Sequence, residues 1–250
     1  MNRGTESTNR TNKTNKRKDN PMENNEIPMA ATPERKQSEQ KWRNSFVKEY
    51  QADQIEQMAN ALKEGQILAF PTDTVYGVGT IYGDADALSR LKQIKHRPET
   101  KPIPMMVSRL EAIEPIVEVN EMAQVLADAF LPGALTLIMP LKENVDRRWT
   151  NDKDTAAVRI PNAPVLLKIM DQLDRPLMVT SANISGEPAA LTKKEAMDML
   201  PGLDGILDGS CHDLQASTII DCTKEEPVVL RQGPISKEQI DQAWKEGKKK

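Results

Sequence analysis

Residues 66–79 read Gln66-Ile67-Leu68-Ala69-Phe70-Pro71-Thr72-Asp73-Thr74-Val75-Tyr76-Gly77-Val78-Gly79. The apolar run over 66–70 predicts a buried strand, and residues 71–79 predict a polar turn that two glycines close. This turn carries hydroxyls, a carboxylate and an aromatic ring, which suit a ligand better than a core. In open α/β proteins such segments follow a strand and form small-molecule sites. We therefore expect a binding site at this end of the sheet.

Helical and strand patterns alternate along the rest of the chain. Helices are expected over 52–64, 85–97, 121–130 and 164–173, and from 192 and 236 onward, where two capping boxes begin. Strands are expected over 66–70, 103–107, 135–139, 156–160, 177–180, 205–207, 218–221 and 228–231. The last three strands are too close together for helical crossovers, so part of the sheet is antiparallel. The pattern predicts an α/β fold with a mixed parallel/antiparallel sheet flanked by helices.

The first 45 of the 250 residues contain almost no Val, Leu or aromatic residue. Such a segment buries too little apolar area to offset a chain entropy of roughly 1–2 kcal/mol per residue. We expect a disordered tail over 1–45 and one folded domain over 46–250. Six basic and two acidic residues lie within the first twenty positions. This excess of positive charge fits either a solubilising tail or an arm that helps to bind RNA.

Composition excludes several classes of protein. No apolar segment follows the basic N-terminal residues, and no apolar run approaches the roughly 20 residues of a membrane span, so a cytoplasmic protein without membrane contact is expected. Cys211 and Cys222 lie neither in a CxxC pair nor beside histidines at metal spacing, so free thiols and no structural metal are expected. A net charge of −3 argues against a surface that binds nucleic acid broadly.

Three cations, Lys95, Arg97 and Lys101, follow the helix expected from residue 85. In one interpretation Lys95 and Arg97 only complement the helix dipole, an effect of about 0.3–1 kcal/mol. In the other, the three side chains converge on a triphosphate, since both lysine and arginine neutralise phosphate charge. Spacing alone does not decide between them.

Arg159 is the single cation in the apolar strand expected over 156–160. A buried guanidinium needs a partner, because an uncompensated buried charge costs several kcal/mol. The partner is either an acidic side chain in a structural ion pair or the carboxylate of a ligand.

A second polar turn, over 180–186, follows the strand expected at 177–180 and reads Thr180-Ser181-Ala182-Asn183-Ile184-Ser185-Gly186. It is either a plain turn with an asparagine in left-handed conformation or a wall that packs against a ligand. No histidine is placed to activate Ser181, so a serine hydrolase is not expected. The chain also lacks the GxGxxG and GxxxxGK[ST] phosphate loops.

Seven segments occur together in the order typical of one family, and through them the chain resembles the YrdC family over about residues 50–235. The segments are PTDTVYGVG (71–79), IKHRPETKPI (94–103), FLPGALTLIM (130–139), AAVRIPNAP (156–164), TSANISGEPA (180–189), STIID (217–221) and VVLRQG (228–233). The resemblance implies a twisted YrdC-like domain with a concave basic groove. It implies synthesis of L-threonylcarbamoyladenylate and pyrophosphate from L-threonine, bicarbonate and ATP with Mg²⁺. The product would serve tRNA modification through the proteins of a threonylcarbamoyl-transferase complex.

The resemblance also implies roles for individual residues. The L-threonine set is Thr74, Arg159, Ser181 and Ser217. The ATP set is Arg97, Lys101, Thr155, Asn183, Thr192 and Arg231, in which the capping-box role of Thr192 competes with ligand binding. Lys95, Arg97 and Lys101 form the implied catalytic set at the phosphates. Met106 stands where many relatives carry a histidine near the threonine, and the chain is expected to be the short form without a further C-terminal domain.

Two other functions compete with this interpretation. A module that binds double-stranded RNA or tRNA without catalysis would use Lys95, Arg97, Lys101 and the basic tail, and its affinity would fall steeply with salt. Carbamoyl transfer in hydrogenase maturation also uses a YrdC-like domain. Those proteins carry cysteine-rich zinc modules, which two cysteines cannot supply.

Overall fold

The computed structural model describes residues 46–98, 100–211 and 215–249, so the predicted tail over 1–45 lies outside the described residues. The strands are β1 (Lys48–Tyr50), β2 (Leu68–Phe70), β3 (Gly77–Ile81), β4 (Met105–Met106), β5 (Leu135–Pro140), β6 (Thr155–Arg159), β7 (Leu177–Ser181), β8 (Gly205–Leu207), β9 (Thr218–Asp221) and β10 (Val228–Arg231). The α-helices are α2 (Ile55–Lys63), α3 (Ala85–Ile94), α4 (Glu121–Phe130), α5 (Pro164–Met170), α6 (Lys193–Met199) and α7 (Lys237–Gly247). Short 3₁₀ helices occupy Leu110–Ala112 and Arg147–Thr150.

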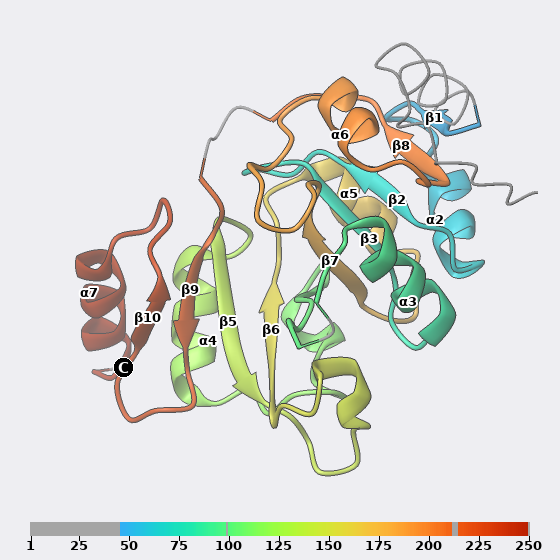
Figure 1. The fold of residues 1–250 in the computed structure, drawn as a ribbon. Coiled ribbons are helices and arrows are strands. Elements are labelled where there is room, and N and C mark those ends of the chain that lie inside the picture. Colours follow the sequence, from blue (N-terminus) through green and yellow to red (C-terminus); the bar gives the residue numbers. More distant parts are fainter. Residues whose placement is uncertain (1–45, 99, 212–214, 250) are drawn as a thin grey trace, which may run out of the picture.

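All strands join one ten-stranded sheet in the order β1-β8-β2-β3-β7-β4-β6-β5-β9-β10 (Figure 1). β1 and β2 pair with β8 in parallel, as does β4 with β6 and β5 with β9. The pairs β2–β3, β3–β7, β4–β7, β5–β6 and β9–β10 are antiparallel. The predicted mixed sheet is therefore confirmed.

Helices cover both faces of this sheet. The larger apolar cluster packs α3, α4, α6 and α7 against one face, and α4 lies beside α7 next to β5 (Figure 1). The smaller cluster packs α2 and α5 against the other face of β2, β3, β7 and β4. Because side chains alternate along a strand, Met105 belongs to the first cluster and Met106 to the second. The face that carries α2 and α5 is also the face that carries the candidate site.

The helix starts follow local sequence signals. Asp84 Oδ1 accepts a hydrogen bond from the backbone N–H of Ala87 at 2.9 Å and caps α3. Both predicted capping boxes are present, one at Thr192 and one at Ser236. In each box the cap side chain and a Glu or Gln three residues later satisfy each other's backbone N–H groups, which fixes where the helix begins.

Two strands were not predicted from the sequence. β1 is a short edge strand, and β3 begins at Gly77, so the prediction that Gly77 and Gly79 close a turn is wrong. These glycines are needed for close packing between strands. A Cβ on Gly79 would lie 2.6 Å from the backbone oxygen of Met178 in β7. The polar turn over 71–76 is therefore the connection of a β2–β3 hairpin.

The described residues agree with the prediction of free thiols. Cys211 and Cys222 are free and buried, and burial raises the pKa of the Cys222 thiol to about 12. Within the described ranges, the helices are too short and too polar to cross a membrane.

Candidate functional site

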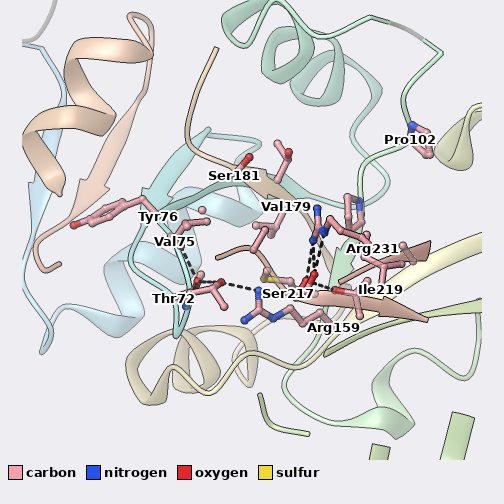
Figure 2. Close-up of a pocket in the computed structure, with 18 of the residues that line it drawn as sticks. Thr72, Val75, Tyr76, Pro102, Arg159, Val179, Ser181, Ser217, Ile219 and Arg231 are labelled. Carbon is pink, nitrogen blue, oxygen red and sulfur yellow. Dashed lines mark hydrogen bonds between the residues drawn. The ribbon is translucent and has the colours of Figure 1, made fainter. Parts of the chain in front are cut away.

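A cavity of about 330 Å³ opens on the face of the sheet that carries α2 and α5 (Figure 2). Its apolar wall includes Met106, Val179 and Ile138. Its polar and charged lining residues are Thr72, Thr74, Arg97, Thr136, Arg159, Thr180, Ser181, Ser217 and Arg231. Six of these nine residues were predicted as site residues from the sequence: Thr74, Arg97, Arg159, Ser181, Ser217 and Arg231.

Strand alternation explains how segments far apart in the sequence meet here. Residues two apart on three neighbouring segments of the sheet line the cavity: Thr136 and Ile138 in β5, Ala157 and Arg159 in β6, and Ser217, just before β9, with Ile219 in β9. The residues between them, such as Leu137 and Val158, point to the opposite face and into the larger apolar cluster. One strip of the sheet therefore presents hydroxyls, a cation and apolar side chains to the same cavity.

Arg159 lies at the centre of the site. Its Nη2 donates to Asp73 Oδ1 at 2.6 Å, its Nη1 donates to Thr74 Oγ1 at 2.9 Å, and its Nε donates to the carbonyl of Gly133 at 3.1 Å. The Arg159 side chain is only 6% exposed. A guanidinium has five N–H donors, so these contacts with described residues leave two donors for a ligand. Of the two interpretations from the sequence, the ion pair is present, and the donors left over also permit a ligand carboxylate.

Ser217 is held from two sides. Arg231 Nη2 donates to the Ser217 carbonyl at 2.8 Å and to the Ser217 hydroxyl at 3.1 Å, and Arg231 Nε donates to the same carbonyl at 3.0 Å. The Ser217 and Thr136 hydroxyl oxygens lie 2.8 Å apart. Figure 2 shows Arg231 meeting Ser217 on one side of the cavity while Arg159 extends toward the turn that carries Thr72. These bonds fix the orientation of the Ser217 hydroxyl.

The electrostatics of the cavity favour an anion. Burial lowers the pKa of Arg97, Arg159 and Arg231, and the charge of Arg159 lowers the pKa of Arg231 further. The charge of Asp73 raises the pKa of Arg159, but it offsets only part of the lowering caused by burial. Three guanidiniums in one cavity repel one another, and a bound anion removes that repulsion.

Of the predicted catalytic cations, Arg97 alone lines the cavity. Its Nη2 donates to the carbonyl of Pro102 at 2.6 Å, and its Nε donates to the carbonyl of Lys101 at 3.2 Å. The Lys101 side chain is exposed at the edge of the same loop. Lys95 is fully buried, and its ammonium donates to carbonyl oxygens of Ser181 and Asn183.

The remaining predicted ATP residues lie outside the cavity lining. Asn183 is buried in the turn after β7. Thr155 begins β6 and shares the sheet face of Ala157 and Arg159, four residues from the latter. Thr192 caps α6, which is the structural role that competed with ligand binding in the sequence.

Sequence reasoning missed two polar partners in the site. It did not include Asp73 among the site residues, although this carboxylate pairs with Arg159. It also left out Thr136, which is buried against Ser217. The signal for Thr136 was a lone hydroxyl in the apolar strand at 135–139. Tyr76, which points away from Arg159 in Figure 2, ties the turn to the carbonyls of Leu207 and Gly209, both at 2.9 Å from its hydroxyl oxygen.

The described residues contain no cluster of three or more His, Cys, Asp or Glu side chains that could hold a metal ion. The Asp73 carboxylate already has a cationic partner, Arg159.

Comparison with known proteins places the chain in a family. Residues 60–233 match the Sua5/YciO/YrdC family model, which is described as "Telomere recombination". The threonylcarbamoyl-AMP synthases of Pyrococcus abyssi and Bacillus subtilis are 38% and 37% identical to the chain over 73% and 75% of its length. The alignments cover 55% and 56% of those relatives, so the chain spans about half of their length. The synthase of Vibrio parahaemolyticus is 32% identical and is covered completely, over 72% of the chain.

Solved structures give the same result. The crystal structure of P. abyssi Sua5 complexed with L-threonine superposes with a TM-score of 0.74 at 35% identity, covering 79% of this chain and 60% of that one. Escherichia coli YciO superposes with a TM-score of 0.68 at 24% identity, covering 75% of this chain and 96% of that one, and supports the fold alone. Together with the family match over residues 60–233, these similarities show that the chain belongs to the Sua5/YciO/YrdC family.

Proposed function

We propose that the chain is an L-threonylcarbamoyladenylate synthase. The observation that carries the proposal is the cavity in which Arg97, Arg159 and Arg231 surround the hydroxyls of Thr74 and Ser217. Such a cavity fits an amino acid carboxylate together with a polyphosphate. Relatives at 37–38% identity are named threonylcarbamoyl-AMP synthases, and one related structure contains L-threonine, which supports the same assignment.

L-Threonine would bind through Thr74, Arg159, Ser181 and Ser217. The two N–H donors of Arg159 not used by described residues suit a carboxylate, which accepts hydrogen bonds in pairs from a guanidinium. The small apolar surfaces of Ala157 and Val179 lie in the same cavity and offer contact for a side-chain methyl.

ATP would bind along the cationic side of the cavity. Arg97 and Arg231 line it, and Lys101 lies on the adjoining loop, so these three cations are the strongest candidates for phosphate contacts. Thr155, Asn183 and Thr192 complete the ATP set that the family resemblance implies. Mg²⁺ would arrive with ATP and neutralise phosphate charge.

The reaction follows from this arrangement. The α-amino nitrogen of L-threonine attacks the bicarbonate carbon, and loss of water gives a carbamate. A carbamate oxygen then attacks the α-phosphorus of ATP, the bond to the bridging oxygen breaks, and pyrophosphate leaves. Arg97 and Lys101 would stabilise the charge on that leaving group, and Arg159 would orient the carboxylate end of the substrate. The enclosed cavity would shield the carbamate from water. We place this activity in the cytoplasm, where the product would pass to proteins that modify tRNA.

Release of pyrophosphate tests the proposal. With ATP, bicarbonate and L-threonine present, release is expected, and omission of any one of the three substrates should abolish it. The double variant Arg97→Ala/Lys101→Ala should lower the rate at least about 100-fold, because two groups on the leaving phosphate are lost. Arg109→Ala is the matched control, since Arg109 is exposed and pairs with Asp171. Release that does not depend on L-threonine, or a double variant as active as the wild type, would contradict the proposal.

A further inference from the structure

The β10 edge of the sheet is apolar and exposed. Among the described residues, the exposed large hydrophobic side chains are Phe46, Val228 and Leu230, and the last two lie in β10, where they are 43% and 56% exposed. β10 ends the sheet, so one side of its backbone has no partner strand in the described part of the chain. An edge strand with exposed apolar side chains is a template for pairing with another strand.

The opposite edge of the sheet is different. β1 carries the charged side chains of Lys48 and Glu49, and its aromatic residue, Tyr50, is buried. Charged side chains on an edge strand oppose pairing with another chain. If two β1 strands paired about a two-fold axis through Lys48 or Glu49, that residue would face the same residue of the partner subunit, and like charges directly opposite are destabilising. Self-association through β10 is therefore favoured over self-association through β1.

A β-bulge accompanies the exposure of Leu230. The ladder between β9 and β10 shifts its register between Val229 and Arg231, so Leu230 has no partner residue in β9. The extra residue of a bulge stays outside the ladder. Val229 packs against the larger apolar cluster, on the face of the sheet that carries α4 and α7 (Figure 1). Val228 and Leu230 stay exposed although α7 follows closely in the chain.

We propose that β10 is the surface through which two copies of this chain associate. Antiparallel pairing about a two-fold axis through Val229 places Val228 opposite Leu230 of the partner subunit, and Leu230 opposite Val228 of the partner subunit. Both exposed apolar side chains of each copy are then covered by a cross-strand neighbour. The contact uses the same patch on both copies and closes as a dimer. It does not depend on the proposed function.

The charges that flank β10 favour the same arrangement. Glu225 and Glu226 precede the strand, and Arg231 ends it. Antiparallel pairing sets the acidic end of one copy beside the basic end of the other, whereas parallel pairing would set like charges together. Because Arg231 lines the cavity, the dimer contact borders the candidate site. Interfaces that bury less than about 1,200 Å² are weak and transient, and a strand of four residues belongs to this class, so we expect association at high micromolar concentration.

Sedimentation velocity of the full chain between about 5 and 500 µM tests the proposal. The wild type should shift from monomer to dimer, and Val228→Lys/Leu230→Lys should raise the dissociation constant at least about tenfold. Phe46→Lys is the matched control, since Phe46 is 69% exposed and lies before β1 at the opposite edge, and this variant should dimerise like the wild type. A wild type that stays monomeric, or equal weakening by the Phe46 variant, would overturn the proposal. Growth beyond a dimer would also overturn it, because a two-fold contact is closed.

Disulfide cross-linking tests the register without lysine substitutions. Residues directly opposite in an antiparallel pair have Cβ atoms about 4.5–5.5 Å apart, close to the separation in a disulfide. Val229→Cys lies on the two-fold axis and should cross-link to its own copy under mild oxidation. Val228→Cys alone should not cross-link, whereas its mixture with Leu230→Cys should. The wild type is the blank, since Cys211 and Cys222 are buried. Absence of cross-links in Val229→Cys, or equal cross-linking of Val228→Cys alone, would overturn the proposed pairing.

Discussion

Asp73 Oδ1 lies 2.6 Å from Nη2 of Arg159, and this ion pair joins the β2–β3 turn to the end of β6. The side chains are 15% and 6% exposed, so both charges are largely removed from water. Because Thr74 Oγ1 accepts from the same guanidinium, two adjacent residues of the turn hold Arg159 in one orientation. The turn is therefore both a wall of the cavity and the support of its central cation.

Asp73→Asn should destabilise the protein. The variant keeps an acceptor of the same shape but removes the charge that compensates buried Arg159. Hydrogen bonds to charged groups contribute about 1.5–3 kcal/mol, which corresponds to a fall in melting temperature of roughly 3–10 °C for a domain of this size. Thermal unfolding measured by circular dichroism checks the prediction.

Asp171→Asn is the control for this measurement. Asp171 pairs with Arg109, and their side chains are 55% and 63% exposed. Exposed ion pairs contribute about 0–1 kcal/mol, so this variant should melt within about 2–4 °C of the wild type. Equal shifts in melting temperature in the two variants would mean that the buried Asp73–Arg159 pair stabilises the protein no more than the exposed pair does.

Local signals in the sequence were enough for most elements of the fold. α4 was predicted with its observed bounds, and in the structure Asn120 caps it and an apolar stripe forms its buried face. β1 could not be predicted, since Lys48-Glu49-Tyr50 has little apolar character and becomes a strand only by pairing with β8. Gly77 and Gly79 were predicted as turn residues for a similar reason. The feature that requires glycine there is the close approach of β7, which is a tertiary contact.

The candidate site, too, could be predicted from the sequence only in part. Arg159 was found because a cation stands out in an apolar strand, whereas Ser217 was found through the family resemblance. Their partners Asp73 and Thr136 depend on how separate segments pack, and the parallel pairing of β5 with β9 is what brings Thr136 beside Ser217. The direction of the Lys95 side chain was likewise hidden, because a lysine at a helix end looks solvated until the turn after β7 is placed against it.

Thr136→Val should weaken L-threonine binding about fivefold. Valine keeps the shape of threonine but removes the hydroxyl 2.8 Å from Ser217 Oγ, and one neutral hydrogen bond contributes about 1 kcal/mol. Thr136→Ser retains that hydroxyl and should bind within about twofold of the wild type, with the affinities measured by calorimetry. Equal weakening in both variants would assign the effect to the lost methyl group rather than to the hydroxyl.

Pyrophosphate should stabilise the protein without L-threonine. The anion relieves repulsion between Arg159 and Arg231 and gives the buried Arg97 a counter-charge, and at 100 times its dissociation constant a ligand adds about 2.7 kcal/mol. Melting temperature should rise by roughly 5–10 °C. Sodium chloride of matched ionic strength should produce a much smaller rise, and Arg231→Gln should lose most of the pyrophosphate effect. A rise that is equal in salt, or unchanged in Arg231→Gln, would argue against binding in this cavity.

Lys95 should make stability depend on pH. Burial, together with the nearby charge of Arg97, lowers the pKa of Lys95 to about 7 from an ordinary 10.5. Between these two values the unfolded chain binds a proton that the folded chain does not. The Lys95 contribution to the free energy of unfolding should therefore rise with pH above 7, by up to about 1.4 kcal/mol per unit, and stay flat below it.

Urea unfolding at pH 6, 7, 8 and 9, measured as the difference between the wild type and Lys95→Met, isolates this contribution because other groups cancel. The carbonyls of Ser181 and Asn183 favour the charged ammonium and reduce the slope, whereas the charge of Arg97 increases it. A neutral amine still has two N–H donors, so the hydrogen bonds of Lys95 to the turn after β7 are weakened at high pH without all being lost. Parallel curves for the two proteins over the whole range would show that the ammonium stays charged, and that its three carbonyl partners outweigh the cost of burial.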